Sequence, residues 1–436
     1  MELCDLLITD TDLLIQADHL EKSVDIAIKD GNILETGKEL SAKYQASETL
    51  KGKGKLFMPG LIDSHMHTGQ QLLKGLVLDA KPIIWTRIML PFESTLTPEK
   101  MKLSAEVAAL EMIHGGTAGF IDAGSYYMDA AARVYAQSGL RGVLSVSTMD
   151  EEGLPESIAT TAREAIEATD RLYDEFHGTG NLKVYYSLRA LNSCSDELVE
   201  LASARAKERH TGLQAHMNEY PGEINGIMER EGMLPYEYME KMGALGEHFL
   251  GAHSLILSEH EKELIKKYGV KLCHCPFSNC GKAVPDTPDL LARGLSVGMG
   301  TDGAAHGGLS LWSEMRIFRS VMNIYHGVPN RNPKVMPAET ILSMVMEGGA
   351  AAMGEGGRLG RLETGYRADL ISIDMNTPHL IPTGNAIHTL MECVEGGDVA
   401  DMIVDGKVIM KNRRVLTLDE ERILYDARAY MEAAGV

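Results

Sequence analysis

The stretch PGLIDSHMH at residues 59–67 is a short apolar run that ends on polar side chains, and this pattern recurs through the middle of the chain. Seven later runs are similarly short and apolar, and segments of helical periodicity separate them. These runs are TAGFIDAG (117–124), LRGVLSVST (140–148), NLKVYYSLRA (181–190), GLQAHMNE (212–219), HFLGAHSL (248–255), VKLCHC (270–275) and LSVGMGTDG (295–303). About eight strands alternating with helices over roughly 250 residues predict an α/β fold, the (β/α)8 TIM barrel.

The segment 97–114 shows most clearly the helical signals that separate these strands. Thr97 suits an N-cap, Pro98 suits the first helical position, and Gly115 is a terminator. The residues expected on its apolar face are Leu103, Val107, Leu110 and Ile113. A doubly wound open sheet is the alternative architecture, but no Gly-x-Gly-x-x-Gly turn follows the first strand.

Both ends of the chain are rich in strand-forming residues and differ from the middle. LLITDTDLLI and VDIAIKDGNILETG lie near the N-terminus, ADLISID and VADMIVDGKVIM lie near the C-terminus, and each end contains an Asp-Gly hairpin signal. Neither end has enough strands to enclose a core alone, so we expect residues 1–58 and 366–425 to form one small β-sandwich domain together. The barrel then covers residues 59–365, and residues 426–436 form a C-terminal helix or tail.

The composition excludes several classes of partner. The 436 residues carry a formal net charge of -20, so nucleic acids and anionic membranes are not expected to bind. The amino terminus lacks the basic and apolar regions of a secretory signal, and no apolar run approaches the roughly 20 residues that span a bilayer. Six cysteines are too few for a disulfide framework, which predicts a cytoplasmic location.

Metal-ligating residue types fall at the carboxyl ends of the predicted strands, where the active site of a parallel barrel lies. Individual strands end on His65 and His67, on His216, on His253 and on Asp302. Residues i and i+2 of an extended segment point to the same side, so His65 and His67 can reach one metal ion. Zinc prefers imidazole and carboxylate ligands of this kind, so the set predicts a metal site.

Five ordered motifs resemble the signatures of the amidohydrolase superfamily: PGLIDSHMH, QAHMNE, GAHSLILSEHE, CHCPFSN and GTDGAAHGGLS. The nearest branch contains methylthioadenosine/S-adenosylhomocysteine deaminases, guanine deaminases and s-triazine hydrolases. The tail, with GRLGRLETGYRADLISID and VADMIVDGKVIM, also resembles that branch, so the similarity covers nearly the whole chain. The resemblance implies a hydrolase that deaminates cyclic amidines in small heterocyclic substrates, assembled as a homodimer or larger homo-oligomer.

Residue by residue, the resemblance also assigns roles. The implied ligands of the catalytic Zn²⁺, for which Fe²⁺ or Mn²⁺ can substitute, are His65, His67, His216 and Asp302. Glu219 matches the family's proton-shuttling glutamate, and His253 matches the histidine that polarises the attacking oxygen. Zinc lowers the pKa of bound water to about 7, so hydroxide can attack the amidine carbon at neutral pH. Asp302 can accept the water proton, while Glu219 can protonate the ring nitrogen and then the leaving ammonia.

The number of metal ions follows from a missing residue. Binuclear relatives bridge two metals through a modified lysine at the end of strand four. The corresponding run here ends on Leu188 and Arg189, and its lysine, Lys183, stands at the start. We therefore expect one metal ion.

Four residues are candidates for binding the substrate: Trp85, Arg189, Asn192 and His306. Arg189-Ala190-Leu191-Asn192 replaces a His-Ser-Pro-Tyr-like stretch of methylthioadenosine deaminases and resembles the Pro-Arg-Phe stretch of guanine deaminases. The guanidinium can hydrogen-bond an oxopurine, or it can pair with a nearby carboxylate. His306, followed by two glycines, departs from the Ser-Asn of adenosine-type relatives. Trp85 can stack on a heterocycle or serve ordinary packing, and LLKGLVLD and LPFE resemble the adenosine-type and triazine branch.

Three hypotheses remain open at this point. The first is deamination of an aminated purine or its nucleoside, such as methylthioadenosine, S-adenosylhomocysteine or adenosine, and the second is a guanine, pterin or s-triazine aminohydrolase. The third is a non-catalytic metal-binding protein, against which Glu219 and His253 argue.

Cys273, Cys275 and Cys280 lack a Cys-x-x-Cys pair and are interpreted as structural, whereas His274 has no assigned role.

Overall fold

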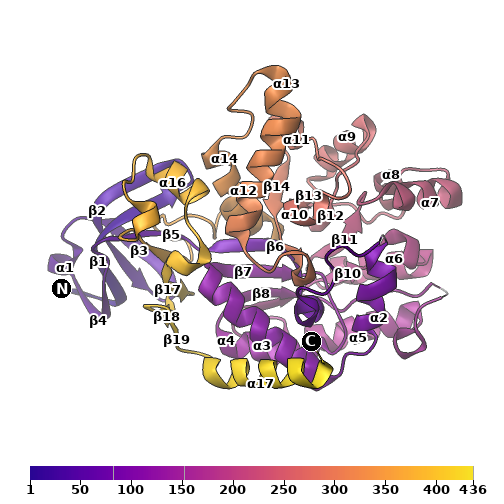
Figure 1. Cartoon of the computed structure of the whole chain (residues 1–436), viewed down its shortest axis with the longest axis horizontal. Coiled ribbons are helices and arrows are strands. Elements are labelled where there is room, and N and C mark those ends of the chain that lie inside the picture. The colour runs from indigo at the N-terminus through magenta and orange to yellow at the C-terminus, as the bar shows by residue number, and fades with distance from the viewer. Residues whose placement is uncertain (82, 152, 436) are drawn as a thin grey trace.

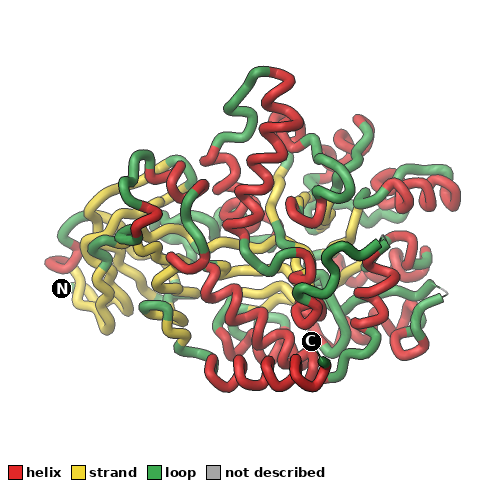
Figure 2. Tube along the Cα trace, viewed as in Figure 1, coloured by secondary structure: helices red, strands yellow, loops and turns green. Residues whose placement is uncertain are grey.

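Strands from both ends of the chain form one part of the molecule, and the intervening residues form the other (Figure 1). The computed structural model describes residues 1–81, 83–151 and 153–435. Strands dominate the first part, whereas helices surround the strands of the second (Figure 2). This is the predicted (β/α)8 barrel with a β-sandwich domain built from both termini. Among the described residues, no helix has both the length and the apolar character needed to cross a bilayer.

Eight strand positions close the barrel within the described part of the chain. Two five-stranded sheets form its wall, in the orders β10-β11-β12-β13-β14 and β15-β6-β7-β8-β9. The strands are β6 (Leu61–His67), β7 (Thr117–Asp122), β8 (Arg141–Leu144), β9 (Leu182–Val184), β10 (Tyr186–Leu188), β11 (Leu213–Met217), β12 (Phe249–His253), β13 (Lys271–His274), β14 (Ser296–Met299) and β15 (Asp302–Gly303). Tyr185 alone separates β9 from β10, and two residues separate β14 from β15, so each pair continues one strand and joins the two sheets into a circle. The eight predicted strands are confirmed.

Helices follow these strands and cover the barrel from outside (Figure 1). In the part of the chain that follows β6 and ends at residue 365, they are α2 (Leu90–Glu93), α3 (Pro98–Gly115), α4 (Met128–Ser138), α5 (Ala162–Phe176), α6 (Asp196–Glu208), α7 (Pro221–Glu231), α8 (Pro235–Lys241), α9 (Glu259–Tyr268), α10 (Pro276–Asn279), α11 (Thr287–Ala292), α12 (Leu311–Met322), α13 (Val328–Asn330), α14 (Ala338–Ser343) and α15 (Gly349–Ala352). Short turns that matter for the site are η1 (Thr68–Leu73), η2 (Trp85–Met89), η4 (Leu191–Ser193) and η5 (Ala304–His306). Outside the barrel lie α1 (Leu40–Lys43), α16 (Ala386–Glu392) and α17 (Glu420–Ala434).

Helix α3 confirms the predicted N-cap and corrects two details of the sequence prediction. The Thr97 hydroxyl accepts a hydrogen bond from Lys100 N at 3.3 Å, as expected of an N-cap. The helix runs one residue further than predicted, because Gly116, with a φ of 87°, takes the left-handed terminating position. The predicted apolar face was partly wrong, since Leu103 and Val107 are only half-buried. Leu110 and Ile113 are buried, as predicted. The other buried residues include alanines and methionines, on a helix that packs against α4 and η1: Met101, Ala105, Ala108, Ala109 and Met112.

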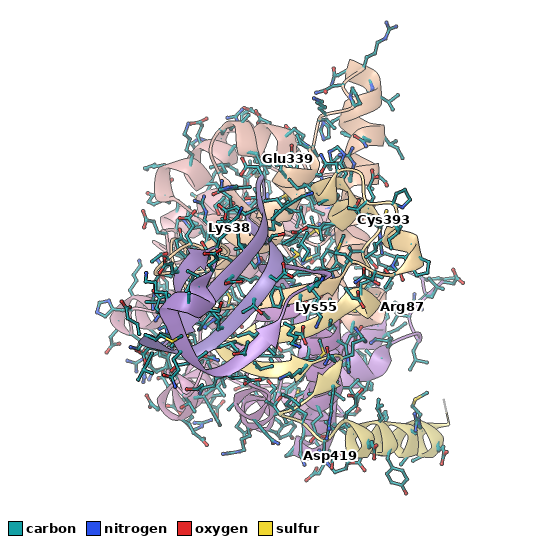
Figure 3. All side chains as sticks on the ribbon, turned by 90° about the vertical axis from the view of Figure 1, so that its left-hand side faces the viewer. Lys38, Lys55, Arg87, Glu339, Cys393 and Asp419 are labelled. Atoms are coloured by element: carbon teal, nitrogen blue, oxygen red, sulfur yellow. The ribbon has the colours of Figure 1, made fainter. Side chains whose placement is uncertain are left out.

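The β domain joins strands from the two ends in one continuous sheet. Its strands are β1 (Glu2–Gln16), β2 (His19–Lys29), β3 (Asn32–Gly37), β4 (Tyr44–Lys51), β5 (Lys55–Pro59), β16 (Leu370–Asp374), β17 (Val399–Val404), β18 (Lys407–Lys411) and β19 (Arg414–Val415). The antiparallel pairing of β5 with β16 connects the N-terminal strands to the C-terminal ones. Lys55, labelled in Figure 3, reinforces this connection, because its Nζ lies 2.6 Å from Asp401 Oδ2 on β17.

The two predicted Asp-Gly turns lie against each other. Asp30 and Gly31 connect β2 to β3 with φ values of 50° and 74°, and Asp405 and Gly406 connect β17 to β18 with values of 51° and 74°. Positive φ at both central residues is typical of the tight hairpin turn that matches strand twist. A Cβ on Gly406 would lie 3.0 Å from the Cα of Gly31, so the close contact requires glycine at both positions.

A buried ion pair holds the β domain against the barrel. Arg141, at the start of β8, donates to Asp369 Oδ2 at 2.6 Å through Nε and to Asp369 Oδ1 at 2.9 Å through Nη2. Asp405 N donates to the same carboxylate at 2.8 Å. A second contact lies outside the barrel, where α17 packs on α3 and Arg422 donates to Glu106 at 2.7 Å. The domain boundaries proposed at residues 59 and 366 remain predictions.

Candidate metal centre and active-site cavity

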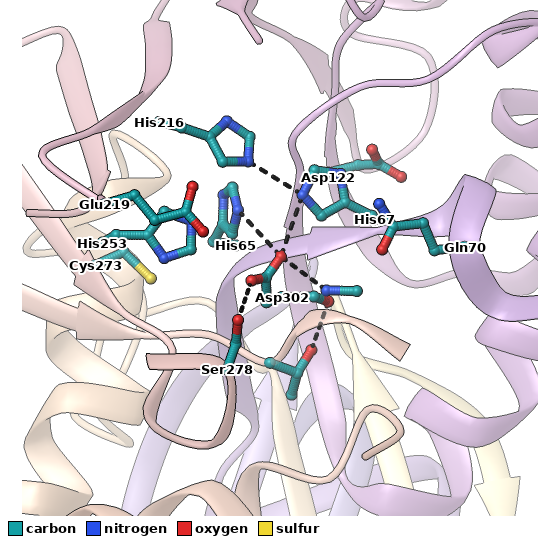
Figure 4. A network of polar contacts seen from close by, with 12 residues as sticks. His65, His67, Gln70, Asp122, His216, Glu219, His253, Cys273, Ser278 and Asp302 are labelled. Atoms are coloured by element: carbon teal, nitrogen blue, oxygen red, sulfur yellow. Dashed lines mark hydrogen bonds and ion pairs between the residues drawn. The ribbon is translucent and has the colours of Figure 1, made fainter. Parts of the chain in front are cut away.

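The carboxyl ends of three barrel strands bring four predicted ligands together. His65 and His67 end β6, His216 lies in β11, and Asp302 begins β15, which pairs with β6. Their ligand atoms all lie within 4.8 Å of one another (Figure 4). His67 Nε2 lies 3.2 Å from His216 Nε2 and 3.3 Å from Asp302 Oδ1, and His65 Nε2 lies 3.8 Å from the same oxygen.

These four residues fit a tetrahedral cation. Ligands at the usual zinc distances of about 2.0–2.1 Å lie about 3.4 Å apart in a tetrahedral arrangement, close to the observed separations. Both ring nitrogens of His65 and Nδ1 of His67 are buried without a hydrogen-bond partner among the described residues. Burial lowers the pKa of His65 and of His216 well below the usual value, which favours the neutral imidazole that a metal requires. The donor set therefore suits Zn²⁺.

Two buried aspartates hold the backbone around these ligands. Asp63 accepts from His65 N at 3.1 Å and from the hydroxyl of Thr301 at 2.6 Å, so it ties β6 to the strand that carries Asp302. Asp122, at the end of β7, accepts from Thr68 N at 3.1 Å, directly after His67. The ligands thus sit on rigid strands whose ends are cross-linked by hydrogen bonds.

Asp302 is held in an unusual backbone conformation that aims its carboxylate at the histidines. Its φ is 61°, and Gly303 N donates to Oδ1 at 2.9 Å. Ser278 donates to Oδ2 at 2.6 Å. Burial would raise the pKa of this carboxyl, but the hydrogen bond with His67 and the charge of Lys282 hold it well below the usual value. Asp302 is therefore ionised, as its predicted role of metal ligand requires.

Glu219 and His253 lie side by side next to the metal ligands. His253 Nε2 is buried and lies 3.7 Å from Glu219 Oε1, while His253 Nδ1 lies 3.1 Å from Asn279 Oδ1. Donation from Nδ1 to this amide oxygen orients the ring and leaves Nε2 facing the centre. Burial raises the pKa of Glu219, but His253 and Lys282 outweigh it and bring the pKa below its ordinary value. The pair can move a proton beside the metal site.

His274 contacts the backbone of His253, and the cysteines lie outside the candidate metal site. The Nδ1 atom of His274 lies 2.8 Å from the carbonyl oxygen of His253, a residue that has a φ of 67°. Cys273 and Cys275 are buried in an apolar cluster, and Cys280 is exposed. No group of potential ligands within the described ranges includes a cysteine.

A cavity of about 760 Å³ opens above the metal site. Among the residues that the structure describes, those that line the cavity are His67, Gln70, Ile83, Ile84, Trp85, Thr86, Met89, Arg189, Ala190, Asn192, His216, Glu219, Tyr220, Pro221, Gly222, Glu223, Phe277, Ser278, Gly281, Lys282, Asp302 and His306. The four residues predicted to bind substrate are all in this lining. His65 and His253 lie beneath it, fully buried. The cavity size suits a nucleoside-sized ligand.

The predicted substrate-side residues have different environments. Arg189 is buried and donates to Glu93 Oε1 at 3.0 Å and to Gly124 O at 3.2 Å. Trp85 lies on η2, with the Arg189 guanidinium 6.0 Å from its ring centroid. Asn192 is exposed at the rim, and His306 is half-buried on η5. The alternative of an arginine paired with a carboxylate is thus the arrangement observed.

Several residues of the cavity were not predicted from the sequence. Gln70 Nε2 donates to Glu93 Oε1 at 2.7 Å, and Arg189 donates to the same oxygen. Glu223 accepts from the backbone amides of Asn218 and Glu219. Ser278 and Lys282 lie in the segment after β13. The sequence marks these unpredicted residues only by their position, because each of them follows the carboxyl end of a predicted strand or lies in the helix after it.

Lys183 lies at the other end of the barrel, as expected. Lys183 lies near the start of β9. Its ammonium contacts the Glu355 carboxylate and donates to Met353 O at 3.2 Å. It therefore cannot bridge a second metal at the strand ends.

Comparison with known proteins adds a family match over most of the chain. Residues 56–409 match the Amidohydrolase family. A 5′-deoxyadenosine deaminase of Methanobrevibacter smithii is 32% identical over 441 residues, which cover 98% of this chain and 97% of the relative. A 5-methylthioadenosine/S-adenosylhomocysteine deaminase of Acetivibrio thermocellus is 30% identical, with coverage of 94% and 95%. In fold, the chain is similar to the crystal structure of an adenosine deaminase from Xanthomonas campestris with bound zinc, with a TM-score of 0.91, 24% identity and 99% coverage of both chains.

Proposed function

The chain belongs to the amidohydrolase family, and we propose that it is a zinc-dependent hydrolytic deaminase of adenosine-type nucleosides. The substrates to test first are 5′-deoxyadenosine and 5′-methylthioadenosine, because the relatives that match nearly the full length carry these activities in their names. The observation that carries the proposal is the convergence of His65, His67, His216 and Asp302 beside Glu219 and His253 at the base of one cavity.

The reaction replaces the exocyclic amino group of the base with oxygen from water and releases ammonia. Zinc, when bound, supplies a water whose pKa is lowered to about 7, so a nucleophile is present at neutral pH. The Glu219 carboxylate takes up one proton of the attacking water and delivers it to the ring nitrogen next to the attacked carbon. The second proton of that water leaves the added hydroxyl as the carbonyl forms, and Glu219 and Asp302 pass it to the departing amino group, which leaves as ammonia. His253, held through Nδ1, keeps Nε2 directed toward the same space.

The cavity wall supports a substrate with an apolar extension. Ile83, Ile84, Trp85, Met89 and Phe277 contribute apolar surface to the cavity lining. A nucleoside whose 5′ substituent is a methyl or methylthio group would cover this surface and gain from its burial. Trp85 and Phe277 offer flat faces for stacking on the base.

The second substrate class loses its main support in the structure. Arg189 favoured an oxopurine because a guanidinium can bind a carbonyl oxygen, but its charge is already paired with buried Glu93. Recognition of guanine through Arg189 would leave Glu93 uncompensated unless the pair persists. Adenosine-type substrates therefore remain the proposal, and guanine, pterin and s-triazine serve as the comparison set.

Ammonia release, measured across both substrate sets with the zinc-loaded protein, tests the proposal. We expect 5′-deoxyadenosine or 5′-methylthioadenosine to give the highest kcat/KM, with the matching inosine-type product. Turnover restricted to guanine, pterins or triazines would overturn the substrate class. A zinc-loaded protein that releases ammonia from none of them would favour a non-catalytic role.

Further properties stay proposals. We propose one zinc per chain, replaceable by Fe²⁺ or Mn²⁺, since no lysine lies at the end of β10. A homodimeric or larger assembly and a cytoplasmic location also remain predictions, to be checked by light scattering and by fractionation.

A further inference from the structure

Lys282 is a nearly buried cation that no role assigned so far explains. It lies in the segment between α10 and α11, and its side chain is 8% exposed. Its ammonium contacts Glu219 Oε1 and lies 2.8 Å from Ser278 Oγ and 3.7 Å from Asp302 Oδ2. The ring centroid of Tyr220 lies 5.1 Å from Nζ. One lysine thus touches groups on both sides of the reaction centre.

We propose that Lys282 is a positioning residue that holds the Glu219 carboxylate in its proton-transfer orientation. This inference rests on the proposed deaminase function. Among the residues that the structure describes, Lys282 is the one hydrogen-bond donor to the Glu219 carboxylate. His253 Nε2 approaches the same oxygen only to 3.7 Å. Without Lys282, little fixes a side chain that has three rotatable bonds.

The contacts of Lys282 also connect Glu219 to the metal ligand Asp302. Lys282 Nζ donates to Ser278 Oγ, and Ser278 in turn donates to Asp302 Oδ2 at 2.6 Å. Two carboxylates that share a poorly solvated cavity repel each other, and a cation between them removes this repulsion. The series of contacts from Glu219 through Lys282 and Ser278 to Asp302 therefore sets the distance between the proton-transferring group and the metal centre.

The geometry distinguishes this role from substrate recognition. The ammonium donates to Glu219 and to Ser278 and lies 3.7 Å from Asp302 Oδ2, so its charge is matched by two protein carboxylates. A lysine that recognised substrate would instead present its charge to the cavity without such partners. Loss of Lys282 should consequently lower kcat more than it raises KM.

Lys262 on α9 is a matched control. It is also a buried lysine, and its Nζ lies 2.9 Å from Glu259, 3.0 Å from Asp286 and 2.8 Å from Asp289. It does not line the cavity. Loss of a buried, paired lysine should destabilise the fold in both cases, but it should impair catalysis only at position 282.

The first test measures kinetics of zinc-loaded Lys282→Met, Lys282→Ala, Lys282→Arg and Lys262→Met. A displaced catalytic group can cost up to about 100-fold, so we expect Lys282→Met to lower kcat by about 10- to 100-fold with little change in KM and full zinc content. Lys282→Arg should retain more activity than Lys282→Met. Propylammonium should partly restore kcat of Lys282→Ala, and Lys262→Met should keep the wild-type kcat.

Three outcomes would overturn the proposal. An unchanged kcat in Lys282→Met shows that Glu219 needs no such support. A loss that follows zinc content assigns the defect to the metal site. A rise in KM alone assigns Lys282 to substrate binding.

The second test does not depend on activity, so it separates this inference from the proposed function. Crystal structures of the zinc-loaded wild type and of Lys282→Met should show Glu219 beside His253 in the former and turned away in the latter. A zinc-loaded wild type in which Lys282 points away from Glu219 refutes the inference, whatever substrate the enzyme uses. Absence of ammonia release from every nucleoside refutes the proposed function and leaves this structural result decisive.

Discussion

The Nε2 atoms of His67 and His216 lie 3.2 Å apart, although 149 positions separate the two residues in the chain. Their rings are nearly parallel, with an interplanar angle of 24°, and Asp302 Oδ1 lies 3.3 Å from the first of them. Two imidazole nitrogens at this separation, with a carboxylate oxygen beside them, match the spacing of ligand atoms around one zinc ion.

Metal removal should therefore abolish activity and lower stability together. A ligand that binds only the folded state stabilises it, so chelation of zinc should lower Tm, and re-addition of zinc should restore Tm and ammonia release. His216→Ala should lose most of its metal affinity because it removes one of four ligands. Elemental analysis should find one zinc per active chain. Two equivalents in active protein contradict the single-metal proposal.

Glu219→Gln should separate catalysis from metal binding. The amide keeps the shape of the side chain but cannot carry the proton, so kcat should fall by at least about 100-fold, within the range of general acid–base catalysis. Zinc content should change little, because Glu219 is not one of the four clustered ligands. Tm should fall, because the variant leaves the buried Lys282 ammonium without this carboxylate partner. Glu229→Gln, an exposed position on α7, is the matched control and should keep wild-type kinetics. Retained turnover in Glu219→Gln would falsify the mechanism.

Glu223 should make stability depend on pH. Burial raises the pKa of its carboxyl to about 8 from an ordinary value near 4.5, although it accepts from the amides of Glu219 and Asn218. The folded state binds this proton more tightly, so the stabilisation is complete below pH 4.5 and is lost as pH rises through 8. The free energy of unfolding of the wild type should fall across this window by up to about 1.4 kcal/mol per pH unit.

Glu223→Gln should lack this component, because an amide does not titrate. Denaturant unfolding at pH 5, 6, 7 and 8, with equal zinc loading, gives the difference between the two proteins. Parallel curves for wild type and variant would show that Glu223 keeps an ordinary pKa.

Arg141→Met should weaken the contact between the two domains. It leaves the Asp369 carboxylate buried without its cation, and breaking one side of a buried ion pair costs about 3–5 kcal/mol. Arg133→Ala is the control, since its ion pair with Glu175 is 61% and 50% exposed, and such pairs contribute about 0–1 kcal/mol. Urea unfolding measures both. Because Arg141 starts β8, at the end opposite the metal site, kcat should persist; equal effects of the two variants would argue against the anchor.

The position of the candidate site residues at the ends of barrel strands could be predicted from the sequence. His65, His67, His216, His253 and Asp302 each close or follow a short apolar run, and parallel strands in a barrel end at one face. The prediction was weaker where packing decides. In α3, Leu103 and Val107 were expected in the core, but they are half-buried, whereas Ala105, Ala108 and Ala109 are fully buried.

The sequence alone determined the eight-stranded barrel and the joined β-rich ends, because these depend on periodicity. Residue type at the strand ends predicted a metal site, and the resemblance to the amidohydrolase superfamily implied its four ligands, which remain a prediction. Tertiary structure decided the pairing of Arg189 with Glu93, the contact of Lys282 with Glu219 and the meeting of Gly31 with Gly406. The partners in each of these contacts are between 63 and 375 residues apart. No local pattern encodes which loop reaches which, since that depends on how helices and loops pack around the finished barrel.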